Sequence, residues 1–201
     1  MRDAPRLLLF DLGGVLVDVS GYRNLGPLLR RSLEDPQVLQ GLRSCPVLRA
    51  FETGQLTASQ FAERFVSAWD CAVGAQEFLR QFRGWTQGFF PGARELLAGL
   101  RPRHRLACLS NSNEVHWERM ERELAVFELF ETALSSHQLG CYKPDPEIYE
   151  RAFAALKVEP AQVIFFDDLA VNVEAARRAG AQAYRVKGIE ELRDCVRRLN
   201  L

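Results

Sequence analysis

Short apolar runs alternate with helix patterns along most of this 201-residue chain, and this alternation constrains the fold more than any other feature. The runs cover residues 6–10, 105–109, 132–135, 163–166 and 182–186, and each is typical of a buried strand. Helix patterns cover 91–100 and 114–125 and begin again near 146, 171 and 189. Strands that alternate with helices predict an α/β fold, with a Rossmann-like parallel sheet of about five strands and helices on both faces.

Residues 20–88 interrupt this alternation, because they contain no strand pattern. Thr57 and Gln60 match a capping box, in which each side chain bonds the backbone N–H of the other residue. Phe61, Phe65 and Trp69 follow at intervals of four residues, which places them on one helix face. We therefore predict a helical domain at 20–88, inserted into a Rossmann-like core formed by 1–19 and 89–201.

Charge and cysteine content narrow the class of protein. Lys and Arg total 26, as do Asp and Glu, so no basic field favours nucleic acid or an anionic membrane as a partner. The apolar stretch at 7–17 is interrupted by Asp11 and two glycines, so it predicts neither a signal peptide nor a membrane span. The five cysteines are scattered without metal-finger spacing, which is typical of packing residues in a cytoplasmic protein.

Polar residues end or follow the predicted strands. Asp11 follows the first strand, Ser110 the second and Asp167-Asp168 the fourth, and Lys143 lies in the loop beyond the third. Open parallel sheets bind ligands beyond the carboxyl ends of their strands. We therefore expect these side chains to converge on one rim of the sheet.

These residue types suit a site for phosphoryl transfer. A carboxylate such as Asp11 can attack phosphorus and form an aspartyl-phosphate that water then hydrolyses. Carboxylate oxygens and a substrate phosphate are ligands that Mg²⁺ prefers. Ser110 can donate a hydrogen bond to a phosphoryl oxygen, and Lys143 can neutralise charge on the phosphate and on Asp11. The glycines after Asp11 let backbone N–H groups approach the same oxygens.

Each of these residues also has a structural explanation when it is taken alone. Asp11 suits a turn, Ser110 suits a bond to nearby backbone, and Lys143 suits a solvated loop. Asp167-Asp168 suits the cap of the next helix, but two adjacent carboxylates at a buried strand end repel each other, and a cation relieves that repulsion.

Together the motifs resemble those of the haloacid dehalogenase-like hydrolase superfamily. The resemblance covers essentially the whole chain, with the motifs in the family's order: Phe10-Asp11-Leu-Gly-Gly-Val15, Leu109-Ser110-Asn111, Lys143-Pro-Asp-Pro146 and Phe166-Asp167-Asp168. The helical insertion is similar to the family's mobile cap domain. The first motif and Phe51-Glu-Thr-Gly-Gln-Leu-Thr57 resemble the bacterial α-D-glucose-1-phosphate phosphatase group.

The resemblance implies a Mg²⁺-dependent phosphatase of a small phosphorylated metabolite, with a sugar phosphate among the candidate substrates. Asp11 is then the nucleophile, with Lys143 as its catalytic partner. The implied metal ligands are Asp11, the Gly13 carbonyl and Asp168, with Asp167 beside them. The implied phosphate-binding residues are Ser110, Asn111 and Lys143.

Gly13 departs from the superfamily pattern, in which most phosphatases carry an aspartate that protonates the leaving group and then activates water. The glucose-1-phosphate phosphatase group also lacks that aspartate, so a solvent water, a cap residue or a good leaving group can compensate. Two alternatives follow: a catalytically impaired relative that binds a phosphorylated ligand or a partner, and a haloacid dehalogenase. A dehalogenase usually has an aromatic residue at position 13 and no acidic pair at the fourth motif.

Several further polar residues have two readings. Arg43, Arg49 and Glu52 in the insertion are candidate substrate contacts, although a solvated surface explains each of them. Asn172 stands where many relatives have an acidic residue, and it suits either a structural hydrogen bond or a metal site.

Overall fold

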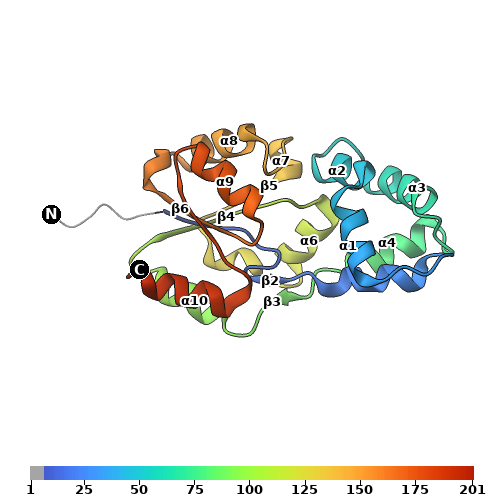
Figure 1. Ribbon diagram of the computed structural model, residues 1–201, viewed down its shortest axis with the longest axis horizontal. Helices are drawn as coiled ribbons and strands as arrows, with labels where there is room; N and C mark the ends of the chain where they lie inside the picture. The colour runs from blue at the N-terminus through green and yellow to red at the C-terminus, as the bar shows by residue number, and fades with distance from the viewer. Residues whose placement is uncertain (1–6) are drawn as a thin grey trace.

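The computed structural model describes residues 7–201, and its centre is a sheet of five parallel strands (Figure 1). The strand order is β5-β4-β1-β6-β7, so the first strand lies in the middle. The strands are β1 (Leu7–Phe10), β4 (Arg105–Ser110), β5 (Thr132–Ser135), β6 (Val163–Asp167) and β7 (Gln182–Arg185). The predicted parallel α/β sheet is confirmed; Arg6, where the first strand was predicted to begin, lies outside the described residues.

Alternate residues of β1 face opposite sides of the sheet, and helices cover both sides. Leu7 and Leu9 pack against α8 (Pro146–Leu156) and α9 (Ala170–Arg178). Leu8 and Phe10 pack on the other side with α5 (Ala93–Leu100), α6 (Glu114–Arg122) and α10 (Gly188–Arg198). Figure 1 shows α8 and α9 above the sheet and α10 below it.

Two predicted helix ends differ from the structure for local backbone reasons. The helix expected at 91–100 begins at Ala93, because Gly92 has a left-handed φ of 83° that is not helical. The helix expected at 114–125 ends at Arg122, and Ala125 has φ 49°, so the helix does not continue through it. The helix start at Asp145-Pro146 is confirmed, with Pro146 at the first helical position.

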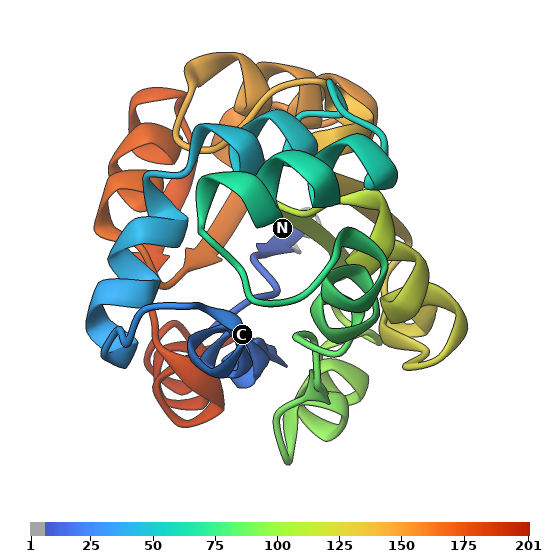
Figure 2. The same cartoon turned by 90° about the vertical axis from the view of Figure 1, so that its right-hand side faces the viewer.

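Helices fill the insertion and form a hydrophobic cluster of their own. They are η1 (Ser20–Leu28), α1 (Asp35–Arg43), α2 (Pro46–Glu52), α3 (Ala58–Ala68) and α4 (Ala75–Arg83). Thr57 caps α3 in the predicted capping box. Phe61, Phe65 and Trp69 are buried together, with the Phe65 and Trp69 rings stacked 5.2 Å apart. Figure 2 shows these helices in front of the end of the sheet.

A short antiparallel ribbon joins the insertion to the rest of the chain. It pairs β2 (Val17–Asp18) with β3 (Gly88–Phe89). The expectation that 20–88 holds no strand is therefore wrong at Gly88, because two-residue strands leave no periodic pattern in the sequence. The sequence also gave no sign of α7 (Ser136–Leu139) or of the 3₁₀ turns η2 (Val126–Leu129) and η3 (Pro160–Gln162).

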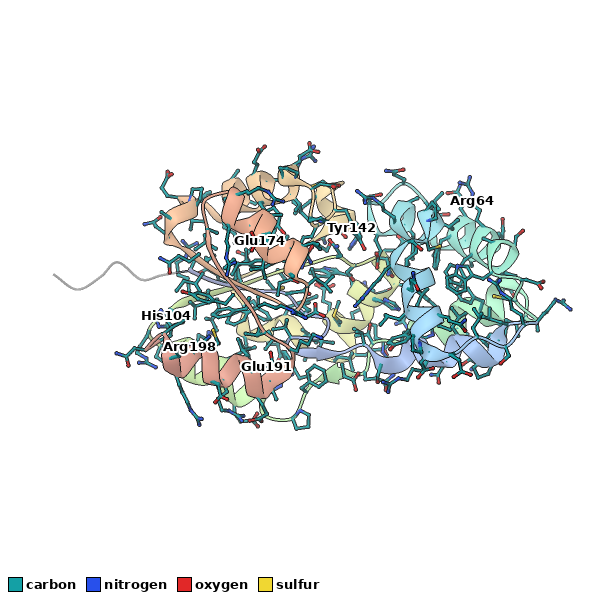
Figure 3. All side chains as sticks on the ribbon, in the orientation of Figure 1. Arg64, His104, Tyr142, Glu174, Glu191 and Arg198 are labelled. Carbon is teal, nitrogen blue, oxygen red and sulfur yellow. The ribbon has the colours of Figure 1, made fainter. Side chains whose placement is uncertain are left out.

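The cysteines lie in the packed interior, and many charged side chains lie on the surface. All five cysteines are buried and unpaired, which confirms their assignment as packing residues. Charged side chains such as Arg64, Glu174 and Arg198 are exposed and point outward (Figure 3). Among residues 7–201, no helix combines the length and the apolar character that a membrane crossing requires.

Candidate active site

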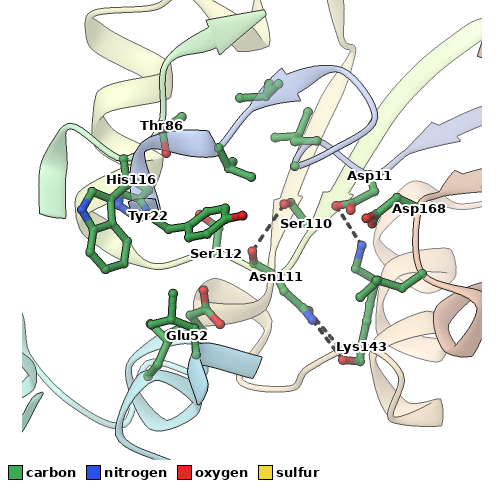
Figure 4. Close-up of a pocket in the computed structure, with 18 of the residues that line it drawn as sticks. Asp11, Tyr22, Glu52, Thr86, Ser110, Asn111, Ser112, His116, Lys143 and Asp168 are labelled. Carbon is green, nitrogen blue, oxygen red and sulfur yellow. Dashed lines mark hydrogen bonds and ion pairs between the residues drawn. The ribbon is translucent and has the colours of Figure 1, made fainter. Parts of the chain in front are cut away.

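The sheet brings the predicted strand-end residues to one rim. β1 pairs with β4 on one side and β6 on the other, so Asp11, Ser110 and Asp167 lie at adjacent strand ends. Asp168 follows β6, and Lys143 enters from the loop between α7 and α8. Figure 4 shows Asp11, Asp168, Ser110 and Lys143 around one pocket.

The Lys143 ammonium group lies at the centre of this rim and is 1% exposed. Its Nζ lies 2.9 Å from Asp11 Oδ1 and 2.8 Å from Asp167 Oδ2, and it donates to the Leu109 carbonyl oxygen at 2.9 Å. Burial would lower the pKa of Lys143, but the Asp11 and Asp167 carboxylates outweigh it and hold that pKa above its usual value. Lys143 is therefore a permanent cation whose three N–H groups all have acceptors.

Asp167 is fully buried and is held on several sides. Its Oδ1 accepts from the Leu169 backbone N–H at 2.8 Å, and Asn172 Nδ2 lies 3.0 Å from both of its oxygens. The structural hydrogen bond expected of Asn172 is thus present. Asn172 Oδ1 is buried and has no partner among the described residues, so it can accept from a group bound in the pocket.

The three aspartates form a concentrated negative group. Oxygen atoms of Asp11, Asp167 and Asp168 lie within 4.8 Å of one another. Burial raises the pKa of Asp11 to about 7; Lys143 opposes that rise and the neighbouring aspartates add to it. Burial and Asp167 also raise the pKa of Asp168. Hard carboxylate oxygens with only one ammonium group among them suit a divalent cation such as Mg²⁺, and the open acceptor on Asn172 suits a water on that ion.

Asn111 and Ser110 are placed differently, although both line the pocket. Asn111 exchanges two hydrogen bonds with the Lys143 backbone: Nδ2 to the carbonyl oxygen at 3.0 Å, and the Lys143 N–H to Oδ1 at 2.9 Å. Asn111 therefore fixes the loop that carries Lys143. Ser110 Oγ has only a long contact of 3.5 Å with the Asn111 carbonyl oxygen, so its hydroxyl is available to a ligand.

Gly13 and Gly14 face different surroundings. Gly14 has φ +74°, and a Cβ there would lie 3.1 Å from Asp168 Oδ2, so only glycine fits without strain. A Cβ on Gly13 would meet only Val19, at 3.4 Å and 3.7 Å. A side chain at position 13 is thus sterically acceptable, and its absence leaves room in the pocket.

The pocket is a cavity of about 260 Å³ between the strand ends and the helical insertion. The insertion side is mainly apolar, with lining residues that include Tyr22, Leu39, Leu42, Leu48, Phe82 and Trp85. Glu52 also lines it, opposite Asp11 and Ser110 (Figure 4). Tyr142 lies where the two halves of the molecule meet (Figure 3) and is hydrogen-bonded to Glu52.

Solvated surface is the wrong assignment for Glu52, whereas Arg43 and Arg49 are exposed. Burial raises the pKa of Glu52 to about 7, while the hydrogen bond from Tyr142 lowers it and Asp11 raises it. Thr86 and Tyr142 were not singled out from the sequence, and His116 was assigned to the surface or the edge of the core; all three line the cavity. The one sequence signal for this side of the pocket was the Phe51–Thr57 motif, which contains Glu52.

The parallel sheet, the carboxylate cluster at its strand ends and the helical insertion place the protein in the α/β class, and comparisons with known proteins identify its family. Residues 5–180 match the model of the haloacid dehalogenase-like hydrolases, so the chain belongs to that family. A D-ribitol-5-phosphate phosphatase of Bacteroides thetaiotaomicron is 23% identical over 89% of this chain and 90% of that protein. A phosphatase of Mycobacterium tuberculosis is 36% identical over 57% of this chain, and the match spans 54% of that protein's length.

The fold resembles that of a HAD family enzyme from Bacteroides thetaiotaomicron, whose crystal structure is a complex with magnesium and inorganic phosphate. The TM-score is 0.74 with 21% sequence identity, and the superposition covers 92% of this chain and 95% of that one. The resemblance to the glucose-1-phosphate phosphatase group in particular stays a prediction.

Proposed function

We propose that the protein is a Mg²⁺-dependent phosphatase of small phosphate esters that works through an aspartyl-phosphate on Asp11. The observation that carries the proposal is the position of Asp11. Its Oδ1 is bound by Lys143, its oxygens lie near Asp168, and it lines the cavity. A carboxylate so placed has a cation at its side and space in front of it for a phosphoryl group.

Each remaining residue has a role in this proposal. Asp11, Asp168 and the Gly13 carbonyl oxygen would hold Mg²⁺, with Asp167 beside them, and the ion would offset negative charge on the phosphoryl group. Asp167 also orients Lys143 through the contact at 2.8 Å. Lys143 neutralises Asp11 and the phosphate, and Ser110 donates to a phosphoryl oxygen while Asn111 fixes the Lys143 loop.

The chain divides into a catalytic core at 1–19 and 89–201 and a helical cap at 20–88. The cap supplies the apolar wall of the cavity, so the organic part of the substrate is small and rests mainly against hydrocarbon and aromatic surface. The similarity to the Mycobacterium tuberculosis and Bacteroides thetaiotaomicron phosphatases supports a small phosphorylated metabolite as substrate. The name of the second, a D-ribitol-5-phosphate phosphatase, supports a sugar or polyol phosphate. The buried, unpaired cysteines support a cytoplasmic location.

The main alternative is a protein that binds a phosphorylated ligand without hydrolysing it. The observation that favours it is Gly13, which carries no acid or base. Dehalogenation receives no comparable support, because the acidic pair that a dehalogenase usually lacks is present at Asp167 and Asp168.

Hydrolysis of p-nitrophenyl phosphate tests the proposal directly. The purified protein should release p-nitrophenol with Mg²⁺, stop when EDTA removes the ion, and stop when Asp11→Asn removes the nucleophile. The exposed Asp194→Asn change is the matched control and should leave the rate unchanged. Absence of turnover on this ester and on a panel of phosphorylated metabolites would overturn the proposal and favour ligand binding.

A further inference from the structure

A phosphatase with glycine at position 13 needs another group to move protons at the ester oxygen. The leaving alkoxide must gain a proton when the phosphorus–oxygen bond breaks, and the water that later attacks the aspartyl-phosphate must lose one. Gly13 has no side chain for either transfer. A side chain that lines the same cavity can supply this group, and the search for it rests on the proposed phosphatase function.

His116 lines the cavity but is engaged at both ring nitrogens. Nε2 lies 2.8 Å from the Phe82 carbonyl oxygen, and Nδ1 lies 3.2 Å from Asn113 Nδ2. The Phe82 carbonyl oxygen can only accept, so Nε2 carries a proton and donates it. The Asn113 amide nitrogen donates, so Nδ1 accepts and carries no proton. The His116 ring is therefore neutral. Burial lowers the pKa of His116 to about 4, in keeping with that neutral ring. Both ring nitrogens of His116 are therefore held by protein groups and are not free to exchange a proton with a ligand.

The other titratable groups of the cavity are also committed or too weakly acidic. All three N–H groups of Lys143 have acceptors, and Asp11 and Asp168 belong to the metal and phosphate side. Burial and the neighbouring Glu52 raise the pKa of the Tyr142 hydroxyl. Among the described residues that line the cavity, Glu52 is the one carboxyl group outside the metal and phosphate side.

Contacts between the helical insertion and the core hold Glu52 in place at the end of α2. Arg49, one turn earlier on α2, bonds Asp145 Oδ2 at 2.6 Å and lies over the Tyr142 ring at 5.0 Å. Tyr142 in turn lies close enough to Glu52 to lower the pKa of that carboxyl group. The α2 helix is therefore docked on the loop that carries Lys143, and Glu52 faces the cavity from the side opposite Asp11 (Figure 4).

The charges around Glu52 suit proton exchange near neutral pH. Burial, opposed by the Tyr142 hydroxyl and aided by Asp11, raises its pKa to about 7. Lys143 faces the cavity but is paired with two carboxylates, and Arg49 is turned toward Asp145. A carboxyl group with a pKa near the working pH is suited both to give and to accept a proton.

We propose that Glu52 is the general acid and base of this enzyme, in the role that an aspartate at position 13 would otherwise fill. Asp11 attacks phosphorus as its carboxylate; the bond from phosphorus to the ester oxygen breaks, and that oxygen takes the proton of the Glu52 carboxyl group to leave as an alcohol. Water then attacks phosphorus of the aspartyl-phosphate and gives a proton to the Glu52 carboxylate. The phosphorus–oxygen bond to Asp11 breaks, which releases inorganic phosphate and restores both carboxyl groups to their starting states.

The test uses two esters that differ in their need for acid catalysis. p-Nitrophenol leaves readily without a proton, whereas a simple alkyl phosphate requires one. Glu52→Gln should lower kcat/KM for the alkyl phosphate by about 10²-fold or more and change kcat/KM for p-nitrophenyl phosphate only slightly. With p-nitrophenyl phosphate it should also lower kcat and give a burst of p-nitrophenol equal to the enzyme, because hydrolysis of the aspartyl-phosphate becomes slow.

Gly13→Asp supplies the second variant, since a Cβ at that position meets only Val19. Added to Glu52→Gln, it should restore alkyl-phosphate hydrolysis, which a merely structural role for Glu52 does not predict. Glu63→Gln, an exposed glutamate on α3, is the matched control, and the circular dichroism spectrum of each variant checks its fold.

Equal losses on both esters without a burst, or full activity of Glu52→Gln on the alkyl phosphate, would overturn the assignment of Glu52 while leaving the phosphatase function intact. A wild-type protein inactive on both esters would overturn the two proposals together.

Discussion

Removal of the Lys143 ammonium group should destabilise the protein strongly, because it leaves buried carboxylates without a partner. Lys143 is 1% exposed and contacts Asp11 at 2.9 Å and Asp167 at 2.8 Å. Breaking a buried ion pair from one side costs about 3–5 kcal/mol, since the remaining charge keeps its desolvation penalty. Lys143→Met keeps the length of the side chain and removes the charge, so we expect a loss of that size in the free energy of unfolding.

Urea unfolding followed by fluorescence measures this loss. With an m-value of about 2–3 kcal/mol/M, the midpoint should fall by about 1–2.5 M. Saturating Mg²⁺ should raise the midpoint of Lys143→Met more than that of the wild type, because the aspartates of the variant carry more uncompensated charge. Adding Asp11→Asn to Lys143→Met should recover part of the loss in the absence of Mg²⁺.

Lys187→Met is the matched control, because Lys187 is exposed. Its midpoint should stay within the small range expected of a surface substitution, about 0.5 kcal/mol. If Lys143→Met unfolded at the same urea concentration as Lys187→Met, the ion pairs of Lys143 would have no net effect on stability, and the reasoning from its burial would be refuted.

Two further predictions concern single residues around the pocket. Gly14→Ala should weaken Mg²⁺ binding in calorimetric titration, because its Cβ would lie 3.1 Å from Asp168 Oδ2 and its φ of +74° disfavours a side chain. The control is Gly99→Ala, where a Cβ meets nothing within 4 Å, and this variant should bind Mg²⁺ normally. Equal Mg²⁺ affinities of the two variants would contradict the steric argument. His116 is held neutral with a pKa of about 4, so stability present above pH 6.5 should be lost as the pH falls toward 4, by up to about 3 kcal/mol. His116→Phe should unfold more easily at neutral pH yet lose less stability over that pH range, and identical losses in both proteins would rule out His116 as the cause.

The arrangement of the sheet followed from the sequence because each core strand is a separate apolar run. Thr132–Ser135 is a strand with the bounds that the pattern predicts, and the others match within a residue or two. The ribbon at Val17–Asp18 and Gly88–Phe89 could not be found in this way. Its two-residue strands are defined by pairing between distant segments, and such pairing leaves no local periodicity.

In the candidate site too, the sequence predicted the residues at strand ends but not the contacts that depend on loop folding and helix docking. Strand ends predicted that Asp11, Ser110 and Asp167 meet, because parallel topology places those ends on one rim. The sequence did not predict that Asn111 would bond to the Lys143 backbone, since that contact depends on how the loop folds back on β4. The sequence motif also flagged the segment of Glu52, but only the docking of α2 places that carboxyl group in the cavity.

In the proposed mechanism, the position of α2 determines whether Glu52 can reach the ester. An aspartate at position 13 would stand beside Asp11 regardless of the position of the helical insertion. Glu52 reaches the cavity only while α2 is docked on the loop of Tyr142, a contact to which Arg49 and Asp145 contribute. That ion pair is about half exposed and so adds little stability by itself. In the proposed mechanism, proton transfer by Glu52 requires this docked position of α2, in which apolar side chains of the insertion line the cavity.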